Sequence, residues 1–249
     1  MAGYPDVPRS AEALLAFARS GAGLLEVGVP AVDPWLDGRE ITAAHQVALR
    51  CGDGVASAVE TVRLVTAEGA RPVYCMAYWG TIRSFGPERF VQQIAAAGAS
   101  GCLIADVAAH SRAAWLSAAS AAGLAAPLLI DRGGRRGEVE ATSREATGFI
   151  YAPAAQGQQT GYSAEIDLPA LAAFVEAVRQ AAPATSVLTG IGISTPALAS
   201  AVVAQCAVDG VVIGSPLVRA FREGGVDRAA ALVGQFVTSI APTAAKVSV

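Results

Sequence analysis

The chain has 249 residues, of which 53% are apolar, 16% charged and 6% aromatic, a composition that excludes disordered and low-complexity proteins. Its 18 Lys and Arg against 21 Asp and Glu give a net charge of −3, which argues against a nucleic-acid or anionic-membrane surface. The most apolar stretch, 118–130, is too short to cross a bilayer, and no Cys/His spacing suits a metal. We therefore expect a cytoplasmic protein with one domain over 1–249, large enough to fold without disulfides or metals.

Short runs of Val, Ile and Leu alternate along the chain with Ala-rich segments of helical spacing. This pattern is typical of parallel strands covered on both faces by helices. We predict strands at 23–29, 71–77, 101–106, 126–130, 148–152, 186–190 and 210–213. We predict helices at 10–20, 55–68, 87–97, 111–122, 168–181, 196–206 and 228–240. Seven strands suit a (β/α)8 barrel and a doubly wound open sheet equally well.

The glycine-rich loops favour the barrel. Neither a dinucleotide-binding G-x-G-x-x-G after the first strand nor a P-loop occurs. Glycines instead end the last two strands, where the chain reads Gly192-Ile193-Ser194 and Gly214-Ser215. Barrels hold phosphate at these two positions, because glycine lets backbone N–H groups approach an anion and the following helix points its positive end at it. With Gly161 in a third loop, the sequence predicts a phosphate site, although the same glycines also suit simple tight turns.

Glu26 lies in the middle of an otherwise apolar strand, Leu24 to Pro30. A carboxyl that points into a barrel loses much of its hydration, so we expect its pKa to rise toward neutrality and the group to exchange protons. The alternative is a buried Glu that is hydrogen-bonded and has no catalytic part.

Asp37 follows Glu26 by eleven residues, in the loop Asp33 to Gly38. We expect this loop to fold over the barrel mouth and to give Asp37 a polar environment, so that one carboxyl transfers protons and the other recognises substrate. Asp33 and Asp37 also suit turns or a helix cap. We expect His45, on the helix that follows, to be an ordinary helix residue.

The residues from Leu25 to Gly38, with both carboxyls and their spacing, resemble the tryptophan synthase alpha subunit family. Further segments resemble that family in the same order along the chain, and together they cover nearly all of it. They are 85–90, 98–101, 104–106, 148–151, 160–161, 190–194 and 209–215.

The resemblance implies a TIM barrel that cleaves indole-3-glycerol phosphate to indole and glyceraldehyde 3-phosphate without a metal or organic cofactor. In this family Glu26 matches the catalytic acid and base, Asp37 the carboxylate on the indole N–H, and Tyr151 an active-site tyrosine beside the Glu. The phosphate clamp of the family matches Gly161, Gly192, Ser194, Gly214 and Ser215. The implied partner is the pyridoxal-phosphate beta subunit of tryptophan synthase.

The chain departs from the family pattern at its beginning and in several loops. Met1 matches the end of the family's first barrel strand, so we expect a barrel whose first strand is absent or replaced, with the tail 245–249 as a candidate replacement. The loops at 31–32, 131–137 and 156–161 also differ, and some of these lie where the family contacts its beta subunit.

Two alternatives therefore stay open: a barrel lyase or aldolase for another phosphorylated substrate, and a non-catalytic partner of a beta-type subunit. We expect a group of arginines to be solvated: Arg83, Arg132, Arg135, Arg136 and Arg144.

Overall fold

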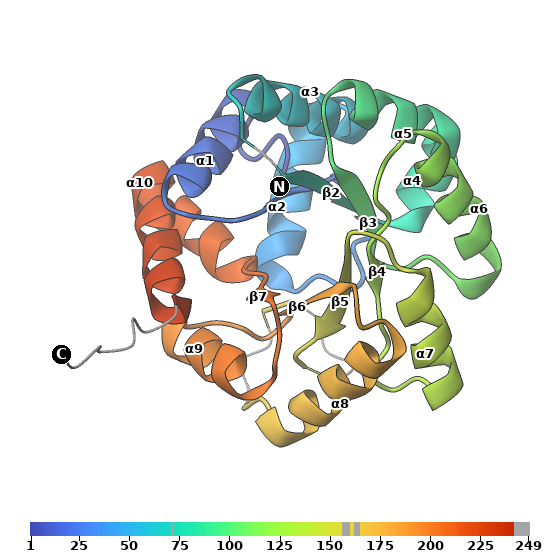
Figure 1. The fold of residues 1–249 in the computed structure, drawn as a ribbon. Coiled ribbons are helices and arrows are strands. Elements are labelled where there is room, and N and C mark those ends of the chain that lie inside the picture. Colours follow the sequence, from blue (N-terminus) through green and yellow to red (C-terminus); the bar gives the residue numbers. More distant parts are fainter. Residues whose placement is uncertain (71, 156–159, 162–164, 242–249) are drawn as a thin grey trace.

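The computed structural model describes residues 1–70, 72–155, 160–161 and 165–241. Its seven strands are all parallel and pair in chain order from β1 to β7, and the sheet curls so that helices surround it (Figure 1). The predicted α/β barrel architecture is confirmed. The strands are β1 Leu25–Gly28, β2 Val73–Ala77, β3 Gly101–Ile104, β4 Leu128–Leu129, β5 Phe149–Pro153, β6 Ser186–Gly190 and β7 Gly210–Val211.

Helices follow each strand and form the outer ring in Figure 1. Those that the sequence predicted are α1 Val7–Arg19, α3 Gly54–Ala67, α5 Pro87–Ala96, α6 Ala109–Ala121, α8 Leu168–Ala181, α9 Pro196–Gln205 and the second part of α10 Ser215–Ile240. The prediction did not include α4 Trp79–Phe85, α7 Arg136–Glu145 and the first part of α10, and it gave α2 Arg39–Cys51 only as the helix that follows the Asp37 loop, without limits.

Helix α7 has few apolar residues, and α10 is interrupted by two glycines. Surface ion pairs support helix α7. The Glu140 carboxylate pairs with the guanidinium groups of Arg136 and Arg144, with N···O distances of 2.9 Å and 3.3 Å, in the i,i+4 spacing that stabilises exposed helices. Helix α10 contains Gly224 and Gly225, and Gly225 has a φ of +68° that breaks the helical geometry. Hydrophobic periodicity alone therefore missed helices whose stability comes from charge pairs or from packing across a kink.

The strands bury side chains on both faces. Residues of β1 to β3 that point outward, such as Val27 and Cys75, pack under α1, α3 and α5. Outward residues of β5 and β6, such as Ile150 and Val187, pack under α8 and α9. Inside the barrel, Tyr74, Leu103, Phe149 and Tyr151 form a separate cluster. This alternation is what places every second strand residue in the barrel interior.

The sheet is open on one side. Among the described residues no ladder joins β7 to β1, and α1 and α10 pack against each other across this side. The segment before α1 lies at the same edge, where the Ala2 N–H donates to the Gly28 carbonyl at 3.0 Å. The tail 245–249, considered above as a replacement strand, lies outside the described residues. None of the helices in the described ranges combines the length and apolarity that a membrane span requires.

Candidate functional site

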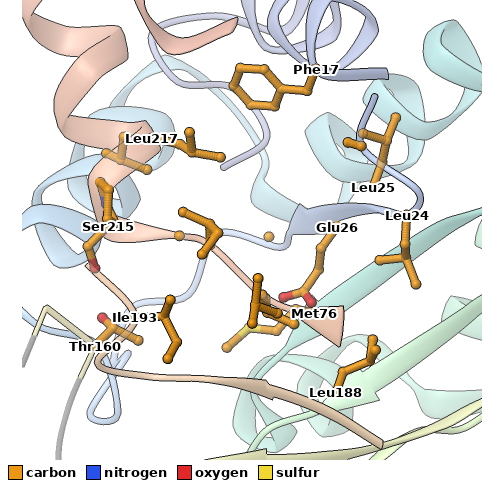
Figure 2. Close-up of a pocket in the computed structure, with 18 of the residues that line it drawn as sticks. Phe17, Leu24, Leu25, Glu26, Met76, Thr160, Leu188, Ile193, Ser215 and Leu217 are labelled. Carbon is orange, nitrogen blue, oxygen red and sulfur yellow. The ribbon is translucent and has the colours of Figure 1, made fainter. Parts of the chain in front are cut away.

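Strand alternation turns Glu26 inward. Its neighbours Leu25 and Val27 are buried on the helix side of the sheet, at 4% and 1% exposure, so the side chain between them points into the barrel. Figure 2 shows the Glu26 carboxyl directed into a pocket beside Met76. Its Oε2 atom is buried and has no hydrogen-bond partner among the described residues. A buried oxygen without a partner in the protein is available to a ligand.

The environment of Glu26 changes its acidity. Burial, and secondly the negative charge of Asp37, raise the pKa of the Glu26 carboxyl from 4.5 to about 7. Loss of hydration is the larger cause because it penalises the charged form directly. Glu26 therefore has a pKa suited to giving and taking a proton near neutral pH.

Asp37 is also buried, at 6% exposure, but it is surrounded by donors. Its Oδ2 atom lies 3.1 Å from His45 Nε2 and 2.8 Å from the Tyr78 hydroxyl. Its Oδ1 atom accepts from the Thr160 hydroxyl at 3.1 Å. Three segments far apart in the sequence thus meet at one carboxylate: α2, the end of β2 and the loop after β5. Asp37 therefore has the polar environment that the sequence led us to expect, and the same segments also bury it.

Thr160 joins the loop after β5 to the loop that carries Asp37. Its N–H donates to the Leu36 carbonyl at 3.0 Å, and its hydroxyl accepts from the Gly38 N–H at 2.8 Å. The two backbones are so close that a Cβ at Gly38 would lie 1.9 Å from the Thr160 carbonyl oxygen. Only glycine fits there, so Gly38 permits the contact that brings Thr160 to Asp37.

Tyr151 lies on β5 and lines the same cavity. A Cβ at Gly190 would come within 2.0 Å of the Tyr151 hydroxyl, so the glycine at the end of β6 makes room for this group. Burial, followed by the charges of Glu26 and Asp37, raises the pKa of Tyr151 well above its usual value. Tyr151 is therefore a neutral hydroxyl near the two carboxyls.

The cavity has a volume of about 780 Å³ and reaches from the two carboxyls to the glycine loops after β6 and β7. Helix α10 begins after Gly214 without a side-chain cap. Pro216 has no N–H, and the Leu217 N–H donates to the Gly214 carbonyl at 2.9 Å. The Ser215 N–H is therefore the first-turn donor that has no partner among the described residues. Helix α9 differs, because the Thr195 side chain accepts from the Leu198 N–H at 3.2 Å. The open helix end at Gly214 is thus the stronger of the two predicted anion positions.

The remaining predicted phosphate residues line the same cavity: Gly161, Gly192, Ser194 and Ser215. Gly161 lies against Ser215, since a Cβ on it would be 3.6 Å from the Ser215 hydroxyl. In Figure 2, Ser215 and Thr160 lie across the pocket from Glu26. The structure therefore gathers all eight predicted site residues around one cavity.

The sequence reasoning gave no site role to the three donors around Asp37, which are His45, Tyr78 and Thr160. His45 was expected to be an ordinary helix residue, but it is 1% exposed and contacts Asp37. Tyr78 was not considered. The available signals were the position of His45 on the buried face of α2, beside Ala44 and Ala48, and the position of Tyr78 directly after β2, where barrel enzymes place functional side chains.

One arginine also differs from expectation. Arg132 is partly buried, donates to the Ala154 carbonyl and stacks over the Phe174 ring at 5.6 Å from its centroid. Arg135 and Arg136 are exposed as expected. Of the loop 156–161, which differs from the family pattern, residues 156–159 lie outside the described residues.

Comparison with known proteins agrees with this geometry. The sequence profile of the family described as "Tryptophan synthase alpha chain" matches residues 1–244. A tryptophan synthase alpha chain of Acidothermus cellulolyticus is 37% identical over 232 residues, covering 92% of this chain and 84% of the relative. That of Leifsonia xyli subsp. xyli is 33% identical over 234 residues, covering 94% and 88%.

Solved structures give the same result. A structure of Mycobacterium tuberculosis tryptophan synthase superposes with a TM-score of 0.86 at 31% identity, covering 96% of this chain and 89% of that one. An Aquifex aeolicus structure superposes with the same TM-score, 0.86, at 24% identity, which supports the fold alone. The profile, the relatives and the fold agree, and the chain belongs to the tryptophan synthase alpha chain family.

Proposed function

We propose that Glu26 and Asp37 are the catalytic pair with which this alpha chain cleaves indole-3-glycerol phosphate to indole and glyceraldehyde 3-phosphate. One observation carries the proposal. A buried carboxyl with a pKa of about 7 and an unpartnered oxygen shares a cavity with a second carboxylate and an open helix N-terminus. Acid, indole anchor and anion site are thus the three parts that this retro-aldol cleavage needs.

Glu26 acts first as the acid. Its protonated form gives a proton to C3 of the indole ring, and the resulting carboxylate takes the proton of the adjacent glycerol hydroxyl. The bond from C3 to the glycerol carbon then breaks, its electron pair returns to the ring, and the hydroxyl carbon becomes the aldehyde. The proton that the hydroxyl loses balances the proton that C3 gains, so Glu26 returns to its starting state.

Asp37 accepts the indole N–H. When C3 is protonated, positive charge develops on the ring nitrogen, and a carboxylate at that position stabilises it more strongly than it stabilises the substrate. The carboxylate has about four acceptor sites, and three are engaged by His45, Tyr78 and Thr160. One acceptor site is left for one N–H donor, which fits indole.

The phosphate of the substrate binds at the glycine loops. Gly214 and Ser215 offer the uncapped first turn of α10, and Gly161, Gly192 and Ser194 complete the rim. Tyr151, a neutral hydroxyl near both carboxyls in the same cavity, contacts the substrate. The alpha chain works with a tryptophan synthase beta subunit, as the family does, and a cytoplasmic location remains our prediction.

The test is indole release from indole-3-glycerol phosphate by wild type and by Glu26→Gln, which keeps the shape of the side chain and removes its acidity. We expect kcat to fall by about 1,000-fold, within the range for loss of a general acid and base. Glu68 is exposed, so Glu68→Gln serves as the matched control, and we expect it to retain wild-type turnover. Full activity of Glu26→Gln contradicts the role of Glu26.

The same assay separates the two alternatives. A non-catalytic partner releases no indole even as wild type with a beta subunit present. An enzyme for another phosphorylated substrate cleaves simpler sugar phosphates faster than indole-3-glycerol phosphate. The present proposal predicts wild-type turnover that favours the indole substrate.

A further inference from the structure

His45 holds both ends of the segment that carries Asp37. Its Nδ1 atom lies 2.9 Å from the backbone N–H of Ala31, and its Nε2 atom lies 3.1 Å from Asp37 Oδ2. Ala31 lies three residues beyond the end of β1 and five residues after Glu26. One imidazole on α2 therefore connects the strand that carries Glu26 to the carboxylate of Asp37.

The hydrogen bonds fix the protonation of His45. A backbone N–H only donates, so Nδ1 must accept from Ala31, and the ring proton lies on Nε2. Nε2 then donates to Asp37 Oδ2. The ring is edge-on to Tyr78, with centroids 6.2 Å apart, so the two donors to Oδ2 also pack against each other. His45 is thus oriented at both nitrogens and by its neighbour.

Among the described residues, other hydrogen bonds hold the middle and the end of the segment but not its start. Val32 is 90% exposed, and the Trp35 indole N–H donates to Asp106 at 3.2 Å. Thr160 bonds Leu36 and Gly38. The carboxylate of Asp37 is therefore aimed by groups outside its own loop. Of its three donors, His45 alone also bonds the backbone at the start of the loop.

We propose that His45 is a positioning residue that braces residues 31–37 and aims the Asp37 carboxylate at the N–H of the indole substrate. The inference rests on the proposed function of Asp37. His45 touches no reacting atom. It acts by fixing where the free acceptor site of Asp37 points, and small displacements of a catalytic group cost up to about 100-fold in rate.

Two substitutions separate the two bonds of His45. The amide of Gln reaches as far as Nε2 and can donate to Asp37, whereas the shorter amide of Asn reaches only to the position of Nδ1 and can accept from Ala31. His45→Gln therefore keeps the bond to the carboxylate, and His45→Asn keeps the bond to the loop. His45→Leu removes both.

The measurement is the affinity of indole-3-propanol phosphate, which cannot be cleaved, and of its 1-methylindole counterpart, by titration calorimetry. We expect wild type to bind the N–H compound at least about tenfold more tightly, since a hydrogen bond to a charged group has that strength. His45→Gln retains more of this preference than His45→Asn, because it keeps the bond to the carboxylate and loses only the bond to Ala31. His45→Asn and His45→Leu reduce it to within about threefold of Asp37→Ala.

Thr42→Val is the matched control, because the Thr42 hydroxyl bonds the backbone carbonyl of Asp37 at 3.1 Å but not its carboxylate. If His45 acts by orienting the Asp37 carboxylate, Thr42→Val retains the wild-type preference for the N–H compound. A preference in His45→Asn equal to wild type, while Asp37→Ala abolishes it, overturns the role of His45. Failure of wild type to bind either compound overturns the proposed function as well, and the melting temperature of each variant shows that it is folded.

Discussion

Glu26 and Asp37 face one cavity, but the protein surrounds them in opposite ways. Glu26 lies within a strand and has a buried oxygen without a partner. Asp37 lies in a loop and receives three donors from three segments. The desolvated group gains a pKa of about 7 and is suited to moving protons, whereas the hydrogen-bonded group is held in place and is suited to recognition. Both carboxyls are buried, so burial alone does not determine their roles. The number of hydrogen-bond donors around each carboxyl makes the difference.

The largest expected effect beyond the loss of turnover is on stability. Because folding raises the Glu26 pKa from 4.5 to about 7, the folded protein binds more protons than the unfolded chain between these values, and stability falls as pH rises through this window. The full loss above pH 7 is up to about 3 kcal/mol, from about 1.4 kcal/mol per pKa unit. Glu26→Gln has no such loss, so its free energy of unfolding exceeds that of wild type at pH 8.

Urea unfolding at pH 5.5 and pH 8 measures this difference. The advantage of Glu26→Gln should be larger at pH 8 by about 2 kcal/mol, since most of the window lies between these two values. Glu68, an exposed glutamate at the end of α3, provides the control variant Glu68→Gln, for which we expect no such gain. An advantage that is equal at both pH values would show that Glu26 is not desolvated.

The next effect is on the pH dependence of turnover. The first step needs the protonated Glu26, so kcat/KM should fall above pH 7, reaching about a tenfold loss per pH unit. The range from pH 6.5 to 9 is suitable, because the substrate phosphate ionises near pH 6. Circular dichroism over the same range tests that the fold persists. A flat or rising profile would contradict the acid role of Glu26.

Much of this molecule can be predicted from local sequence pattern. Strand β6 at 186–190 and helix α8 at 168–181 begin and end where the sequence predicted. Each is a clear apolar run with a turn or a cap at its ends. The inward direction of Glu26 also follows from the pattern, since alternation places a residue between two buried neighbours on the other face.

The surroundings of Asp37 could not be predicted in the same way. His45 is eight residues from Asp37, Tyr78 is 41 and Thr160 is 123, and only the closing of the sheet brings them together. No local periodicity encodes such contacts. The resemblance to the family identified the two carboxyls, but the buried donors around Asp37 depend on tertiary packing of α2 and of the loop after β5.

The smallest expected effect tests how redundant those donors are. Thr160→Val keeps the side-chain shape and removes two hydrogen bonds, the one donated to Asp37 Oδ1 and the one accepted from the Gly38 N–H, while His45 and Tyr78 stay on Oδ2. Each such hydrogen bond contributes about 1 kcal/mol, and only the one to Asp37 acts on the carboxylate that binds the indole N–H, so we expect kcat/KM for indole-3-glycerol phosphate to fall about fivefold. Thr238→Val, which removes a hydroxyl bonded within α10, is the matched control and should leave kcat/KM unchanged.

The size of this loss decides between two descriptions of Asp37. A fivefold fall means that the remaining donors hold the carboxylate and that Thr160 adds one bond among three. A loss as large as that of Glu26→Gln would mean instead that the bond from the Gly38 N–H to the Thr160 hydroxyl assembles the site, so that the loop after β5 would control catalysis. The contrast between one unpartnered and one well-partnered carboxyl predicts the smaller loss, because three independent donors do not fail together.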